Sequence, residues 1–202
     1  FADGAGAYLL GAATLTNNTI TGNAALQAGA YGGGVVTSGD LTAQGNIIVG
    51  NFASVNTDLA LSDSGGALVN FSGPNLIGYG PGVFNPGVSD NVSNADPMEV
   101  FDQTVTKNGA VAGVAADNGG PVQTVALKTD VANPVLDASG ADAPATDARG
   151  FTASVFAGVN AGAGFGPRDL GAFEASGDPA GPDPDSDPQP EAKSLVVTTT
   201  DD

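Results

Sequence analysis

The stretch Asn18-Thr19-Ile20-Thr21-Gly22-Asn23 recurs further along the chain as Asn46-Ile47-Ile48-Val49-Gly50-Asn51. The two stretches start 28 residues apart. The same spacing of 28 residues relates Ala13–Thr16 to Leu41–Gln44, and the alignment between these stretches contains no gap. Self-similarity at a fixed period is typical of repeat proteins, in which each unit packs on its neighbours. We therefore interpret the first part of the chain as a stack of repeated units.

Each unit opens with a glycine-rich strand. Gly4–Leu9 aligns with Gly32–Thr37 at the same spacing. A third copy matches less regularly. Gly65–Val69 is expected to correspond to the glycine-rich strand, and Asn75–Gly78 is expected to correspond to the Asn-Ile-Ile strand. The first copy begins close to Phe1, so we expect further coils, a cap or another subunit to cover that end.

The unit is too short for a propeller blade of about 40 residues, but it fits one coil of a parallel β-helix. Successive coils rise by about 4.8 Å, which stacks equivalent side chains on one another. We expect two such ladders, with the members Ile20, Ile48 and Ile77 turned inward, and Asn18, Asn46 and Asn75 at a corner. The predicted fold class is all-β, a right-handed parallel β-helix with a C-terminal cap and a terminal donor-like strand.

The chain divides into four predicted parts. The ranges are 1–95 for coils of about 28 residues, 96–176 for C-terminal coils and a cap, 177–193 for an acidic Pro-rich linker, and 194–202 for a β-strand that leads to a next domain or subunit. Within the first part, Gly80 to Asn94 is rich in Gly, Pro, Asn and Ser and is interpreted as a loop. Five prolines are expected to stiffen the linker.

Composition excludes several functions. The net charge is −17, with only five Lys and Arg, so the chain lacks the cations that nucleic acids and anionic membranes attract. It has no Cys and no His, which removes disulfides, zinc sites and imidazole or thiol catalysis. No apolar run is long enough for a membrane span.

Four segments of the second half occur in a specific order. They are Asn118-Gly119-Gly120-Pro121, Asn133-Pro134-Val135-Leu136-Asp137-Ala138, Thr146-Asp147-Ala148-Arg149-Gly150 and Asp169-Leu170-Gly171-Ala172-Phe173-Glu174. Over about Asn17 to Glu174 this order resembles the choice-of-anchor Q domain family of bacterial surface proteins. The resemblance implies a right-handed parallel β-helix, carries no catalytic motif, and makes the last segment a cap over the final coil. The tail Ser194–Asp202 resembles the strand that precedes a CSLREA-type motif, although the motif itself is missing.

The charged residues fit structural roles better than catalysis. A lyase needs a basic residue, and the five cations Lys107, Lys128, Arg149, Arg168 and Lys193 all lie outside the repeated coils. A glycosidase needs two carboxylates on one face, and the coils offer Asp3, Asp40, Asp58 and Asp63, of which the last two share a probable loop. We expect no catalytic, cofactor or metal residues. Charge pairs inside the cap better explain Arg149 beside Asp147 and Arg168 beside Asp169.

Calcium is the ligand that the residue types suit best, because carboxylates and Asn carbonyls abound, yet no calcium-binding motif occurs. Asp183, Asp185 and Asp187 are interpreted as a solvated part of the linker. The predicted function is that of a structural segment in an extracellular or cell-surface filament or stalk. Its expected partners are copies of itself or neighbouring β-helix domains. The alternatives are an adhesin segment that binds glycan or a host surface and, less favoured, a carbohydrate-active enzyme.

Overall fold

The computed structural model describes residues 6–55, 57–62, 67–78, 91–93, 95–130, 132–140, 143–152 and 168–175. These hold fourteen strands and one short helix, so the protein is all-β. The strands of the first half form three separate sheets in which every pair is parallel. The predictions for Phe1–Ala5, the linker 177–193 and the tail 194–202 lie outside the described residues.

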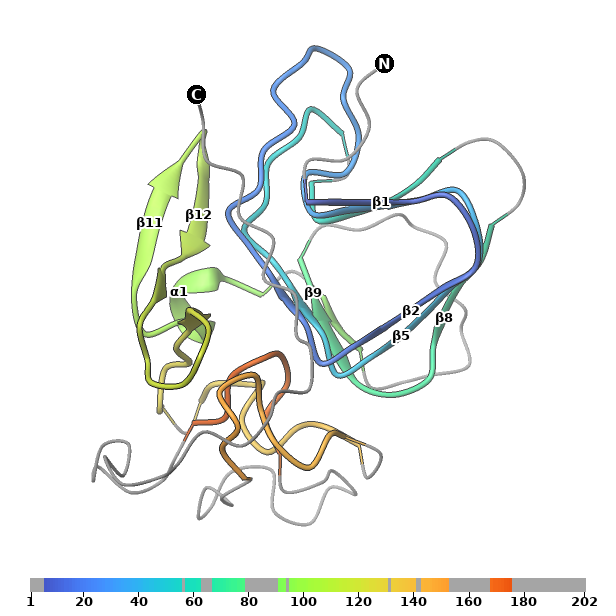
Figure 1. The fold of residues 1–202 in the computed structure, drawn as a ribbon. Coiled ribbons are helices and arrows are strands. Elements are labelled where there is room, and N and C mark those ends of the chain that lie inside the picture. The colour runs from blue at the N-terminus through green and yellow to red at the C-terminus, as the bar shows by residue number, and fades with distance from the viewer. Residues whose placement is uncertain are drawn as a thin grey trace.

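The chain passes through the three sheets in a fixed order, and we call each passage a coil. The first sheet contains β1 (Ala7–Leu9), β4 (Val35–Thr37) and β7 (Leu59–Leu61). The second contains β2 (Ala13–Thr16), β5 (Leu41–Gln44) and β8 (Val69–Phe71). The third contains β3 (Thr19–Ile20), β6 (Ile47–Ile48), β9 (Asn75–Ile77) and β10 (Asn91–Ser93). Figure 1 looks along the stack, so that β2, β5 and β8 lie nearly over one another.

The register confirms the repeat spacing between the first two coils. Ala7 pairs with Val35, Ala13 with Leu41 and Thr19 with Ile47, and these pairs all have the same separation in the chain. In the third coil, however, the predicted counterpart of the glycine-rich strand is wrong. Leu59 pairs with Val35 at a shorter separation, while Val69 pairs with Leu41 in the second sheet. Val69, the last residue of the predicted Gly65–Val69 strand, therefore lies in the second sheet and not in the first.

Two further expectations differ from the structure. Asn91–Ser93, predicted within a loop, forms β10 and pairs in parallel with β9. The part 96–176 was expected to continue the coils, but its described strands pair antiparallel. These are β11 (Thr104–Lys107) with β12 (Ala110–Gly113), and β13 (Ala115–Ala116) with β14 (Thr124–Val125). The helix α1 (Pro97–Val100) begins at Asp96, whose side chain accepts from the N–H of Met98.

Both faces of the third sheet are buried. Inside the coils, Ile48 and Ile77 pack with Val35, Leu41 and other aliphatic residues, and Ile20 packs against them from the first coil, as the ladder predicted. On the outer face, Ile47 and Leu76 share a second core with the C-terminal half, which includes Phe101. Figure 1 shows α1, β11 and β12 beside this sheet. Parallel sheets that are covered on both faces carry continuous aliphatic strands, as here.

The C-terminal segment lies along the side of the coils. The N–H of Gly171 donates to the carbonyl of Gly45 over 2.7 Å, and the N–H of Ala172 donates to Oγ1 of Thr19 over 3.0 Å. A Cβ at Gly171 would overlap Thr19 and Ile47, so only glycine permits this approach. These contacts are with the first and second coils. The expected cap over the final coil is therefore, in its described residues 168–175, a lateral cover of the third sheet.

Candidate functional site

An asparagine ladder runs along the corner before the third sheet. Nδ2 of Asn18 donates to Oδ1 of Asn46 over 3.1 Å, and Nδ2 of Asn46 donates to Oδ1 of Asn75 over 2.9 Å. The backbone N–H groups of Asn18 and Asn46 donate to the same two oxygens, each over 3.0 Å. The predicted ladder is confirmed. Each rung fixes both a side chain and a backbone group of the neighbouring coil, which holds the coils in register.

A second ladder, which was not predicted from the sequence, follows the third sheet. Nδ2 of Asn23 donates to Oδ1 of Asn51 over 3.1 Å, and Nδ2 of Asn51 donates to Oδ1 of Asp58 over 2.8 Å. The signal was present, because Asn23 and Asn51 stand at the repeat spacing. Asp58 supplies the last rung from a different part of its coil. A carboxylate only accepts, so it ends a ladder whose amides all donate in one direction.

The opposite end of both ladders lies in the first coil. Among the described residues, no donor reaches Oδ1 of Asn18 or Asn23. The three strands β1, β2 and β3 all lie at sheet edges. Their inward side chains, such as Ala7 and Leu9, are only partly buried, whereas Val35 and Thr37 in the next coil are fully buried. On this face of the stack, no described strand pairs with the outer edges of β1, β2 and β3, and the aliphatic side chains are only partly covered.

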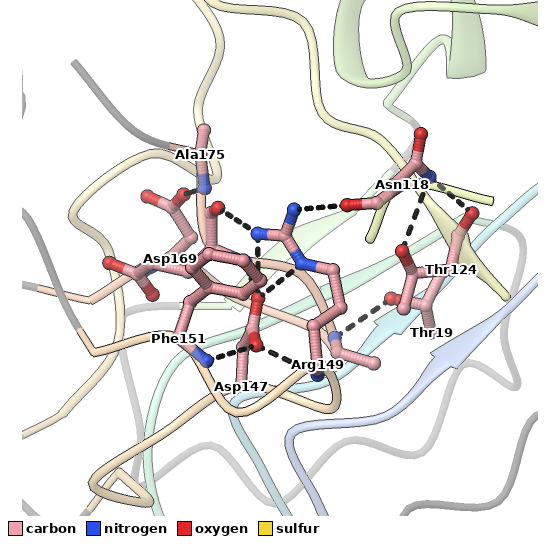
Figure 2. A network of polar contacts seen from close by, with 10 residues as sticks. Thr19, Asn118, Thr124, Asp147, Arg149, Phe151, Asp169 and Ala175 are labelled. Carbon is pink, nitrogen blue, oxygen red and sulfur yellow. Dashed lines mark hydrogen bonds and ion pairs between the residues drawn. The ribbon is translucent and has the colours of Figure 1, made fainter. Parts of the chain in front are cut away.

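Arg149 is the centre of a buried polar cluster in the C-terminal half (Figure 2). Its guanidinium forms an ion pair with Asp147 at 2.8 Å, and donates to the carbonyls of Asn118 over 3.0 Å and Glu174 over 2.6 Å. The rings of Phe151 and Phe173 lie 4.6 and 3.8 Å from its centre. The predicted Arg149–Asp147 pair is confirmed. A planar guanidinium suits this site because it can donate in several directions and stack on rings.

Three of the four short motifs of the second half, those that contain Asn118, Arg149 and Glu174, meet at this cluster. Gly120 has φ +84° and leaves no room for a Cβ beside the Arg149 backbone. Asp147 accepts from the N–H groups of Phe151 and Glu174 as well as from Arg149. Segments that are separate in sequence are thereby fastened to one another. The order of these segments was visible in the sequence, but their convergence was not.

Asp169 is held differently from the expected pair with Arg168. Its carboxylate accepts from the N–H of Asp137 over 2.8 Å and from the N–H of Ala175 over 2.6 Å, whereas Arg168 donates to the carbonyl of Ala145. Burial raises the pKa of Asp169 to about 7, and this effect outweighs the two backbone hydrogen bonds, which lower it. The nearby carboxylates of Asp137 and Asp147 add to the increase in this pKa.

A cavity of about 130 Å³ lies between this cluster and the first coil, with Asn17, Asn18, Asp147 and Asp169 in its wall. This volume is large enough to hold several water molecules. The Asp147 and Asp169 carboxylates already accept backbone N–H groups. Within the described ranges, no group of three or more acidic residues is arranged to hold a metal ion. The cavity is therefore built from groups that fasten the C-terminal segment.

The carboxylates considered for glycosidase chemistry are not brought together where the structure describes them. Asp58 is buried and ends the second ladder, while Asp40 accepts from the N–H of Leu68 at an exposed position. Asp3 and Asp63 lie outside the described residues, as do Lys193 and the linker acids Asp183, Asp185 and Asp187. Lys107 lies in β11, and Lys128 is exposed beyond β14.

Comparisons with protein-family models, with curated proteins and with solved structures found no match. In the part of the chain that the structure describes, no helix has the length and apolar character needed to cross a membrane.

Proposed function

We propose that this chain is a non-catalytic structural segment of an extracellular or cell-surface filament or stalk. In this proposal the three parallel sheets are the faces of a right-handed parallel β-helix. The chain is a member of the choice-of-anchor Q domain family, and its partners are copies of itself or neighbouring β-helix domains. Stacked coils suit this role because length is added by repeating one unit, each of which contacts only its neighbours.

One observation carries the proposal: the first coil has the register of the second, but no described strand pairs with its outer edge. Ala7 and Leu9 are partly buried and Tyr8 is 40% exposed, whereas Val35, Val36 and Thr37 opposite them are 0% exposed. An unpaired parallel edge readily accepts another strand. A further coil or a strand of a second molecule would complete this face in the way that the first coil completes the second.

Two features support a structural role over catalysis. The chain has no His or Cys, and Asp58, one of the four coil carboxylates considered for catalysis, serves as a ladder end. The segments that carry the family resemblance include Asn118, Arg149 and Glu174, which meet in one structural cluster. These residues hold segments of the C-terminal half together. This structural role fits a family that carries no catalytic motif.

Electron microscopy of the full chain, with and without Ser194–Asp202, tests the proposal. We expect elongated particles that extend along the coil axis at high protein concentration, and their shortening when the tail is deleted. Single compact particles in both samples would contradict a filament or stalk. An assay with acidic polysaccharides tests the non-catalytic part, because cleavage that disappears in Asp58→Asn would establish an enzyme instead.

A further inference from the structure

The open edge of β1 has a defined hydrogen-bonding pattern. The N–H of Ala7 donates to Gly34 over 2.9 Å, and the carbonyl of Leu9 accepts from Ser38 over 2.9 Å, so both residues direct backbone groups toward β4. Successive residues of a strand direct these groups to opposite sides. The N–H and C=O of Tyr8 therefore face the open edge, where no described strand pairs with them.

The C-terminal tail repeats the sequence of the strand that lies next to β1. Val35-Val36-Thr37-Ser38-Gly39-Asp40 matches Val196-Val197-Thr198-Thr199-Thr200-Asp201 at four of six positions. Two valines followed by threonine favour a strand with a partly buried surface. In the first sheet, Val35 packs inward among the core residues and Val36 faces outward. Both side chains are fully buried. The tail thus has the side chains that this sheet uses.

We propose that Ser194–Asp202 of a second copy adds to the open edge of β1 as a parallel strand, with Val196 opposite Ala7, Val197 opposite Tyr8 and Thr198 opposite Leu9. This inference rests on the proposed function and names the docking edge and its partner. In this register, the N–H of Tyr8 donates to the carbonyl of Val196. The N–H of Thr198 donates to the carbonyl of Tyr8, and Val196 continues the inward stack.

The other edge of the first sheet, at β7, differs from the β1 edge in carrying a Cβ at the position before the strand. A Cβ placed on Gly34 would overlap the carbonyl of Asp58, its equivalent in the next coil. Asp58 carries a real Cβ at this position, and its side chain is fixed by Asn51. A strand paired in register beyond β7 would meet that Cβ. At the β1 edge the equivalent residue is Gly6, and Leu195 of the tail would bring a Cβ to this position, so the proposed pairing begins at Val196.

The linker favours a second copy over the tail of the same chain. Gly177–Lys193 contains five prolines and five acidic residues. Such a sequence favours an extended spacer of about 3.1 Å per residue, stiffened by proline and by charge repulsion.

Disulfide trapping tests the register directly, because the chain has no cysteine of its own. Neighbouring parallel strands lie about 4.8 Å apart, which is within disulfide range for directly opposite residues on one face. We expect the full chain with Tyr8→Cys and Val197→Cys to form a ladder of disulfide-linked multimers under mild oxidation. The matched control, Tyr8→Cys with Val196→Cys, places the second thiol on the other face and should lose this ladder.

A backbone variant gives an independent test. Tyr8→Pro removes only an N–H that faces the open edge, a position where edge strands tolerate proline. We expect it to keep the circular dichroism spectrum of the full chain but to lose assembly in sedimentation velocity. Tyr8→Ala, which keeps the N–H, should retain assembly.

Three outcomes would overturn this inference. Equal trapping of both cysteine pairs, or of neither, would reject the register. Cross-linked monomers without multimers would assign the tail to its own molecule. Assembly of Tyr8→Pro to the same extent as Tyr8→Ala would reject this edge. Elongated particles that persist in any of these cases would leave the filament proposal standing, so the two failures are distinguishable.

Discussion

Nδ2 of Asn46 lies 2.9 Å from Oδ1 of Asn75, although 29 residues separate them in the chain. The same amide group donates to the carbonyl of Leu15 in the first coil over 2.8 Å. One buried side chain therefore joins three successive coils. Such a residue acts as a fixed point for the register, since a slip by one residue would leave these buried groups without partners.

Loss of the Asn46 amide should destabilise the stack strongly. Asn46→Ala would remove one of the two donors that Asn46 supplies to Oδ1 of Asn75, the acceptor for the N–H of Asn18, and the donor to the carbonyl of Leu15. We expect the free energy of unfolding to fall by about 3 kcal/mol, measured by urea denaturation. Asn18→Ala, at the partly exposed first rung, should cost about 1 kcal/mol. Equal losses in the two variants would contradict the central role of Asn46.

Gly34 is required by the approach of the next coil. Gly34→Ala would place a Cβ against the carbonyl of Asp58 and the amide of Asn51. We expect a loss of about 2 kcal/mol in stability, because fixed backbone atoms cannot move aside. Gly11→Ala is the matched control, since a Cβ there meets no atom within 4 Å. Its effect should lie within about 0.5 kcal/mol, and a similar loss in both variants would contradict the contact.

Arg149 should hold separate segments of the C-terminal half together. Arg149→Met leaves Asp147 buried without its cation and leaves the carbonyls of Asn118 and Glu174 without this donor. We expect a loss of about 3 kcal/mol and faster hydrogen exchange at the N–H of Glu174. Lys128→Met removes an equal charge at an exposed site and should change neither. Unchanged exchange at Glu174 in Arg149→Met would contradict the fastening role.

Asp169 should make stability fall as the pH rises. Its pKa is about 7 in the folded chain and 3.8 as the ordinary value, so the folded state holds the proton more tightly. This contribution is complete below about pH 4 and is lost as pH rises toward 7. We expect the signed difference, Tm of the unmodified chain minus Tm of Asp169→Asn, to fall over this window. A difference that grows with pH would mean that the carboxylate is stabilised as an anion.

The coils could be predicted from the sequence where the repeat is regular. The repeat spacing identified the rungs Asn18, Asn46 and Asn75, and the inward stack of Ile48 on Ile77. The prediction failed at the first strand of the third coil for a physical reason. Gly34 is needed because another coil follows it, whereas Asp58, at the edge, has no such neighbour among the described strands. The glycine signature therefore disappears at Leu59–Leu61.

The candidate site was less predictable. Adjacency in sequence suggested the Arg149–Asp147 pair, but the partners Asn118 and Glu174 lie 31 and 25 residues from Arg149. The buried state of Asp169 depends on Asp137 and Ala175, which contact it only in the folded chain. The side on which residues 168–175 pack could not be inferred, because Gly171 contacts Gly45 in a distant part of the sequence.

The most direct test of the central claim is cryo-electron microscopy of the full chain after assembly at neutral pH. Parallel β-helix coils that continue from one copy to the next predict strands perpendicular to the long axis, spaced by about 4.8 Å without a break at the boundary between copies. That result would establish a structural segment that extends by coil stacking. Compact single copies at every concentration, with no continuation of the strand spacing, would contradict it.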